Sequence, residues 1–163
     1  MKILYLVRHA KSSWEDQSLS DFQRPLNPRG ERDAPDMGHR LMKMGIMPDL
    51  MLSSPAVRAI TTCETIADQL GYAKDQIEKD KAIYHAGEFK LLEVVHEIND
   101  HVKSLMLFGH NPGITEFANA LTNSSIDNIP TCGVFACSFD IIHWSDVQLG
   151  NGKLLFYDYP KNQ

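Results

Sequence analysis

Three short apolar runs, each followed by a segment of helical periodicity, constrain the fold of this chain most strongly. The runs cover residues 2–8, Asp49–Ser53 and Ser104–Phe108, and they are continuous rather than alternating. Continuous runs of this length are typical of strands that are buried on both faces, as in parallel sheets. Strands that alternate with helices predict a mainly parallel sheet covered by helices on both sides. We therefore expect an α/β fold in the form of a three-layer α/β/α sandwich.

Start and stop signals place the remaining elements. Asn27-Pro28 predicts the start of a helix that runs to about Met44, and Gly45 ends it. Pro35 and Gly38 lie inside this helix and predict an interruption or kink, because each disfavours a helix interior. The other expected elements are a helix from Ser54-Pro55 to Gly71, an extended segment at Ala82–His85, helices at 88–101 and at about Ile114–Leu121, and a late strand pair at Val134–Ile142 and Lys153–Tyr159.

Composition and charge narrow the class of protein. The chain has 163 residues, 43% of them hydrophobic and 23% charged, which is typical of a soluble globular protein with one domain over residues 1–163. Its net charge of −5 argues against nucleic-acid and anionic-membrane partners, and no apolar run approaches a signal peptide or membrane span. We therefore expect a cytoplasmic protein. Reduced thiols are expected at the three cysteines, which match no zinc or CxxC spacing: Cys63, Cys132 and Cys137.

Charged, hydrogen-bonding residues follow the three apolar runs. Val7 is followed by Arg8-His9, Ser53-Ser54-Pro55 leads to Arg58, and Phe108 leads to His110 in the turn Gly109-His110-Asn111-Pro112-Gly113. In open α/β sheets, ligands bind beyond the carboxyl ends of the parallel strands, which lie along one edge. The two arginines and two histidines are therefore expected to meet there.

Three of these residues also have an ordinary structural interpretation. Arg58 is then a solvated surface arginine, His9 a buried and satisfied imidazole, and His110 a histidine bonded to a neighbouring carbonyl. However, Arg58 falls in the first turn of its helix, where the dipole disfavours a cation by roughly 0.3–1 kcal/mol. An anion between the arginine and the free N–H groups of the helix start removes that conflict. The convergence of three strand ends favours such an anion site.

Phosphoryl transfer is the chemistry that these residue types suggest. Arg8 and Arg58 would neutralise the phosphoryl oxygens through forked hydrogen bonds, with no metal or cofactor required. A neutral His9, whose other ring nitrogen donates to a backbone carbonyl, would attack in line to give a phosphohistidine. A protonated His110 would stabilise the equatorial oxygens. Lys11 and Ser12 continue past the first strand as further phosphate donors, although solvent exposure explains Lys11 equally well.

A proton donor for the leaving group is harder to place. Glu88, at the expected start of a helix, and Asp21, in the polar loop from Ser12 to Leu26, are the candidates. A glutamate at a helix start is also simply a favourable partner for the helix dipole.

The motifs resemble those of a known family. Arg8–Trp14 resembles the Arg-His motif of the histidine phosphatase superfamily, the phosphoglycerate mutase-like proteins, and Asp21–Gly30 resembles the loop and helix start of its small phosphohistidine phosphatases. Ser53-Ser54-Pro55 with Arg58 is similar to the second arginine motif, Gly109–Gly113 to the second histidine motif, and Pro130–Val134 to the Pro-Thr-Gly turn. The resemblance implies a phosphoglycerate mutase-like fold, no cofactor, His9 as the phosphorylated nucleophile, and a phosphate pocket formed by Arg8, Arg58 and His110.

The leading hypothesis is a metal-independent phosphatase that dephosphorylates phosphohistidine on a phosphocarrier or signalling protein. The family's mutase-type acid motif is not clearly present, which fits a leaving imidazole that takes its proton from solvent. Only a short strand and a helix separate the Arg58 helix from His110, so the pocket is expected to be open to a protein substrate. The alternatives are a phosphatase of small phosphate monoesters, a non-catalytic phosphate-binding module and a histidine-based metallohydrolase. The last is disfavoured by the lack of metal-ligand spacing.

Overall fold

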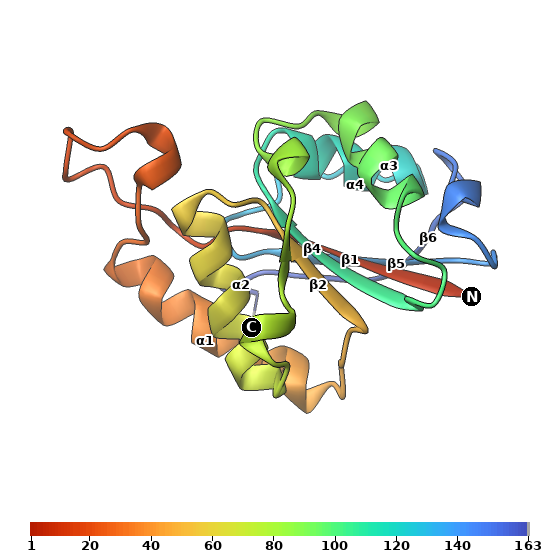
Figure 1. The fold of residues 1–163 in the computed structure, drawn as a ribbon, viewed down its shortest axis with the longest axis horizontal. Coiled ribbons are helices and arrows are strands. Elements are labelled where there is room, and N and C mark those ends of the chain that lie inside the picture. Colours follow the sequence, from red (N-terminus) through yellow and green to blue (C-terminus); the bar gives the residue numbers. More distant parts are fainter. Residues whose placement is uncertain (163) are drawn as a thin grey trace.

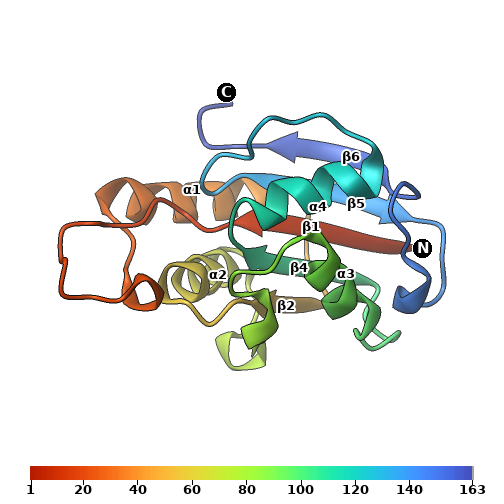
Figure 2. The same cartoon turned by 90° about the horizontal axis from the view of Figure 1, so that it is seen from above.

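A six-stranded mixed sheet forms the centre of the computed structural model, which describes residues 1–162. In the order β3-β2-β4-β1-β5-β6, the first four strands are mutually parallel, and β5 runs antiparallel to both β1 and β6. Figure 2 shows most of this order from above. The mainly parallel α/β fold predicted from the sequence is confirmed. The strands are β1 (Lys2–Arg8), β2 (Leu50–Ser53), β3 (Glu78–Lys79), β4 (Ser104–Gly109), β5 (Val134–Phe139) and β6 (Lys153–Asp158).

Helices cover both faces of the sheet, which gives the expected three layers (Figure 1). On one face lie α1 (Pro28–Lys43) and α2 (Val57–Leu70), and on the other lie α3 (Glu88–His96) and α4 (Gly113–Thr122). Strand β1 contributes side chains to the hydrophobic cores on both faces of the sheet, because successive side chains point to opposite faces. Leu4 and Leu6 pack with α3 and α4, whereas Tyr5 and Val7 pack with α1 and α2.

Helix α1 is continuous through Pro35 and Gly38, so the predicted interruption is wrong. Asn27 caps its start by accepting a hydrogen bond from the Gly30 N–H at 2.9 Å. At Gly38, an added Cβ would lie 2.8 Å from the Cβ of Gln69 on α2, so glycine permits the two helices to approach closely. The burial of one helix face thus outweighs the hydrogen bond that Pro35 does not make.

Other boundaries also differ from the sequence prediction, and β5 ends at Phe139 rather than at Ile142. Residues 81–83 form a short 3₁₀ turn (η3, Lys81–Ile83) rather than an extended segment, and the edge strand β3 lies just before it. The Asp80 side chain accepts a hydrogen bond from the Ala82 N–H at 2.9 Å and so begins this turn. Helix α3 ends at His96 instead of residue 101. There the side chain of Asn99 accepts from the His101 N–H at 2.8 Å, which favours a turn over another helical turn.

The three cysteines are free, as predicted, and all three are buried. Burial raises the pKa of Cys137 to about 12, so its thiol stays protonated at neutral pH. Within residues 1–162, no helix combines the length and apolarity needed to cross a bilayer.

Candidate active site

The carboxyl ends of β1, β2 and β4 meet at one edge of the sheet. The strand register pairs Arg8 with Gly109 and Ser53 with Phe108, and the His9 N–H donates to the Gly109 carbonyl at 3.1 Å. A pocket of about 450 Å³ opens beyond these ends. Six residues singled out as site residues from the sequence line it: Arg8, His9, Lys11, Ser12, Arg58 and His110.

His9 is a neutral imidazole, and one of its ring nitrogens is engaged in a hydrogen bond to the backbone. Its Nδ1 donates to the Ala10 carbonyl at 2.7 Å, which is the backbone bond expected from the sequence. Burial, followed by the positive charges of Arg58, Arg8 and Arg24, lowers the pKa of His9 to about 4. Since Nδ1 carries the proton, Nε2 keeps the lone pair that a nucleophile needs.

Arg8 directs only part of its guanidinium to the protein. Its Nη1 donates to the Ile129 carbonyl at 2.9 Å, whereas its buried Nε has no hydrogen-bond partner. The turn before β5 fixes the backbone here, because the Cys132 N–H approaches the carbonyls of both Arg8 and His9 at 3.0 Å. Cys132 adopts a φ of 62°, a left-handed conformation that is uncommon outside glycine.

Arg58 is buried, with 5% of its surface exposed, so the interpretation of a solvated surface arginine is wrong. Its Nη1 donates to the Asp21 backbone carbonyl at 2.6 Å, and its Nη2 donates to Asp21 Oδ2 at 2.9 Å. The buried Nε of Arg58 has no partner. Asp21 therefore accepts one hydrogen bond from each terminal nitrogen of Arg58. The sequence suggested that these nitrogens would hold phosphate. A guanidinium has five N–H donors, so Nε–H and the second hydrogens of the terminal nitrogens remain.

His110 lies beside His9, with ring centroids 5.2 Å apart, and its Nε2 is 2.8 Å from Ser54 Oγ. Ser54 Oγ also accepts from the Ala56 N–H at 3.2 Å, so its own hydrogen is available to His110 Nε2. When the Ser54 hydroxyl donates to Nε2, the proton of the neutral ring lies on Nδ1, which is buried and has no partner.

The sequence predicts a cationic His110 when the ring faces phosphate, and the protein groups alone favour the neutral ring. Burial, followed by the nearby His9 and Arg58, lowers the pKa of His110 to about 3. A phosphoryl dianion beside the ring would raise the pKa of His110. As a neutral ring protonated on Nδ1, His110 is already a hydrogen-bond donor to an oxyanion.

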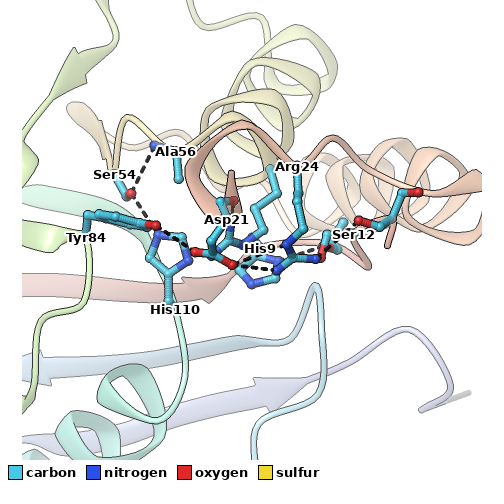
Figure 3. Close-up of polar contacts among 11 residues, drawn as sticks. His9, Ser12, Asp21, Arg24, Ser54, Ala56, Tyr84 and His110 are labelled. Atoms are coloured by element: carbon cyan, nitrogen blue, oxygen red, sulfur yellow. Dashed lines mark hydrogen bonds and ion pairs between the residues drawn. The ribbon is translucent and has the colours of Figure 1, made fainter. Parts of the chain in front are cut away.

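Asp21 is held as an ionised carboxylate by its hydrogen-bond partners. Its Oδ2 accepts from the Tyr84 hydroxyl at 2.6 Å, and its Oδ1 accepts from Arg24 Nε and Nη2 at 3.2 and 3.1 Å (Figure 3). The Tyr84 hydroxyl, followed by the guanidinium groups of Arg58 and Arg24, holds the pKa of Asp21 far below its usual range. This low pKa disfavours Asp21 as the source of the leaving-group proton.

The structure does not bring Glu88 into the pocket. Ala86 and Gly87 line the pocket wall, and Glu88 follows them as the first residue of α3 without being among the lining residues. Ser12 lines the pocket, but its Oγ accepts from Arg24 Nη1 at 2.7 Å, so it orients an arginine. Lys11 is exposed at the pocket.

Arg24 is the main pocket residue that strand-end reasoning missed. It lies in a loop without periodic pattern, and the residue is 7% exposed with its guanidinium 3.5 Å from the centroid of the Trp14 ring. The stretch Asp21–Gly30, which carried part of the family resemblance, was the signal that points to it. Further lining residues are Trp14, Asp21, His85, Asn111 and Thr131.

Unpartnered nitrogens gather in this pocket. Among residues 1–162, the buried side-chain nitrogens without a hydrogen-bond partner are Arg8 Nε, Arg58 Nε and His110 Nδ1, and the other such atom is the oxygen Asp33 Oδ2. A buried polar group without a partner costs about 1–3 kcal/mol. The residues that carry these three nitrogens line the same pocket as His9, so the pocket gathers unpartnered N–H donors of the kind that bind oxyanions.

Comparisons with known proteins agree with this geometry. Residues 4–89 match the family model described as histidine phosphatase superfamily (branch 1). An uncharacterized chloroplastic protein of Arabidopsis thaliana is 34% identical over 137 residues, which cover 79% of this chain and 62% of that protein. The chain belongs to the histidine phosphatase superfamily.

Two solved structures share its fold over nearly the whole chain. A candidate phosphohistidine phosphatase SixA from Agrobacterium tumefaciens is 26% identical, with a TM-score of 0.83 and 98% of each chain covered. The protein histidine phosphatase SixA complexed with tungstate is 21% identical, with a TM-score of 0.79 and the same 98% coverage of both chains. The fold is that of the phosphoglycerate mutase-like proteins, as the sequence resemblance implied.

Proposed function

We propose that this chain is a metal-independent phosphatase that removes the phosphoryl group from phosphohistidine on a protein, through a phosphorylated His9. One observation carries the proposal: a neutral His9 with a free Nε2 lies in a pocket with three buried, unpartnered nitrogens. These nitrogens belong to groups that bind and stabilise phosphoryl oxygens.

Two displacements at phosphorus make up the reaction. In the first, the bond between phosphorus and the substrate imidazole breaks as a bond forms to His9 Nε2. Arg8, Arg58 and His110 hold the equatorial oxygens, while His9 Nδ1–H keeps its bond to the Ala10 carbonyl. In the second, water attacks phosphorus and breaks the bond to Nε2. Phosphohistidine and water thus give histidine and inorganic phosphate, and His9 returns to its neutral form.

The charge state of Asp21 and the position of Glu88, the two candidate proton donors, also favour a phosphoramidate substrate. Asp21 is held ionised, and Glu88 lies outside the pocket lining. An alkoxide leaving group needs a positioned acid. A phosphorylated imidazole that is protonated on its other nitrogen departs as neutral imidazole, so it makes no such demand on these two residues.

A small phosphate monoester is the second candidate substrate, and two further cations favour it. Lys11 and Arg24 line the pocket together with Arg8 and Arg58. They would suit an ester that carries another anionic group.

The test compares kcat/KM for a phosphohistidine protein with kcat/KM for sugar phosphates and alkyl phosphates, each with and without EDTA. We expect the phosphohistidine protein to be preferred by at least about 100-fold, with no effect of EDTA. A preference for the small esters would replace the proposed substrate with the second candidate. Loss of activity in EDTA that zinc restores would contradict metal independence, and phosphate binding without turnover of any substrate would indicate a binding module.

A further inference from the structure

The Asp21 carboxylate connects three separate parts of the chain. It begins the short 3₁₀ turn η1 (Asp21–Gln23), which α2 contacts. Its Oδ2 accepts from the Arg58 Nη2 of α2 and from the Tyr84 hydroxyl of the segment before α3, at 2.9 and 2.6 Å. Its Oδ1 accepts a hydrogen bond from Arg24, which directly follows η1 in the chain (Figure 3). Both carboxylate oxygens therefore hold pocket residues in place.

Asp21 controls the orientation of Arg58 in particular. The Arg58 guanidinium donates Nη1 to the Asp21 carbonyl at 2.6 Å and Nη2 to the Asp21 carboxylate, so one residue fixes both terminal nitrogens. A planar guanidinium that is held at two corners has its third nitrogen directed as well. That third nitrogen, Nε, is one of the three unpartnered buried nitrogens of the site.

We infer that Asp21 is a positioning residue for the phosphoryl-binding arginines, and that the Tyr84 hydroxyl holds Asp21 in that role. The inference rests on the proposed function, because it assigns Arg58 Nε to a phosphoryl oxygen. Asp21 acts through Arg58 and Arg24 and transfers no proton. Its negative charge also opposes a phosphate dianion in the ground state, so its contribution is to the alignment of donors in the transition state.

Asp21→Asn keeps the size of the side chain but removes its charge and replaces one acceptor with a donor. We expect kcat for p-nitrophenyl phosphate to fall about 10- to 100-fold, the range for a misaligned donor at a transferring group. The inhibition constant of inorganic phosphate should stay within about threefold or decrease, because a repelling charge is lost as alignment is lost. A merely structural role would instead weaken phosphate binding together with kcat.

A second pair of substrates separates positioning from acid catalysis. The factor by which Asp21→Asn lowers kcat should be the same for p-nitrophenyl phosphate and for an alkyl phosphate. A factor that is about 10-fold or more larger for the alkyl phosphate would show that Asp21 protonates the leaving group, and would overturn the inference.

Tyr84→Phe tests the same contact from the other side. It removes the donor to Asp21 and keeps the ring, which lies 5.2 Å from Phe22 and 5.5 Å from His110 between centroids. We expect a smaller loss of kcat, about 3- to 10-fold, and no further loss when the change is added to Asp21→Asn. Tyr72→Phe is the matched control, since its hydroxyl donates to the Gln76 carbonyl and Tyr72 does not line the pocket. It should leave kcat unchanged.

Thermal melts of each variant establish that the chain is folded. Independent, multiplicative effects of Asp21→Asn and Tyr84→Phe would contradict the inference, as would an unchanged kcat in folded Asp21→Asn. The two proposals fail separately: a wild type that cleaves p-nitrophenyl phosphate but not phosphohistidine refutes the proposed substrate and leaves this test intact.

Discussion

Each end of strand β1 carries a cation, buried at Lys2 and half-buried at Arg8, and the two cations have different hydrogen-bond partners. At the amino end, Lys2 is 3% exposed, and its Nζ donates to the carbonyls of Asp100 and Val102 at 2.6 and 2.9 Å. At the carboxyl end, Arg8 donates to the Ile129 carbonyl at 2.9 Å but keeps a buried Nε without a partner. Both ends therefore hold a cation at least partly out of water, whereas an unpaired buried donor occurs at the end where the pocket lies.

The histidines show the same contrast. His143 lies at the Lys2 end of the sheet, is exposed, and its Nδ1 is 2.9 Å from Asp100 Oδ2. His110 lies at the Arg8 end, has a partner at Nε2 only, and its Nδ1 is buried without one. Satisfied groups explain stability, and unsatisfied ones indicate function. Substitutions at the two ends should therefore have opposite effects on activity and stability.

The largest effect is expected from His9→Ala, which removes the nucleophile. Phosphatase activity should fall by about 10⁴-fold or more, because no other group forms the covalent intermediate. His143→Ala is the control at the opposite end and should leave kcat/KM unchanged. Residual activity of His9→Ala within about tenfold of wild type would place the nucleophile elsewhere.

Arg8→Met and Lys2→Met should have opposite effects on activity and stability. Arg8→Met should lower kcat/KM by about 10²- to 10³-fold. The Ile129 carbonyl keeps its bond from Asn111 Nδ2 at 3.1 Å, so the free energy of unfolding should be unchanged or higher.

Lys2→Met should do the reverse. The Val102 carbonyl keeps its bond from Trp144 Nε1 at 2.7 Å, but the Asp100 carbonyl loses the Lys2 partner, which should cost about 1–3 kcal/mol of unfolding free energy. Its kcat should equal that of wild type. Urea denaturation and steady-state kinetics on both variants check the exchange, and a loss of both properties in either variant would contradict it.

Lowering the pH should reduce the free energy of unfolding, because of the two histidines in the pocket. Their pKa values are about 4 for His9 and about 3 for His110, below the 6.5 of an unfolded histidine. Between pH 6.5 and these values the unfolded chain binds protons that the folded chain does not, so stability should fall as the pH falls through this window. Activity should likewise be lost as His9 protonates, near pH 4.

Urea denaturation from pH 7 to pH 4 measures this dependence. The slope of unfolding free energy against pH should be smaller in His9→Ala, which lacks one of the two groups. Added inorganic phosphate should also reduce the slope, because an anion beside His110 raises its pKa. Equal slopes for wild type and His9→Ala would show that His9 does not titrate in this way.

The smallest effect is expected at Lys11, an exposed cation at the pocket. Lys11→Ala should raise KM about two- to fivefold, with kcat unchanged, and the effect should shrink with added salt. Lys103→Ala, at the other end of the sheet, should change neither constant. A fall in kcat of tenfold or more for Lys11→Ala would place Lys11 on the transferring phosphoryl group.

The strand ends were predictable from the sequence because their signals are local. Continuous apolar runs fix β1, β2 and β4, and parallel pairing then brings Arg8, His9, Arg58 and His110 to one edge. The backbone bond of His9 followed from the chemistry alone. The continuity of α1 could not be predicted from the sequence, because the close contact between Gly38 and Gln69 is a tertiary feature that outweighs helix propensity.

The Asp21 network could not be predicted in the same way. Asp21 meets Arg58 across 37 residues and Tyr84 across 63, from a loop with no periodic pattern. Its ionised state depends on those contacts, so the sequence left Asp21 open as a proton donor. The pKa of His110 without phosphate depends likewise on burial and neighbouring cations, and neither is visible in the motif.

The central claim is that phosphoryl transfer passes through His9, and a rapid-quench experiment tests it most directly. The chain is mixed with a phosphohistidine protein, quenched in alkali within one turnover, and analysed by peptide mass spectrometry. The account predicts acid-labile phosphate on His9 that forms and decays at rates consistent with kcat and is absent from His9→Ala. Phosphate on a different residue, or turnover by wild type with no phosphorylated enzyme, would contradict it.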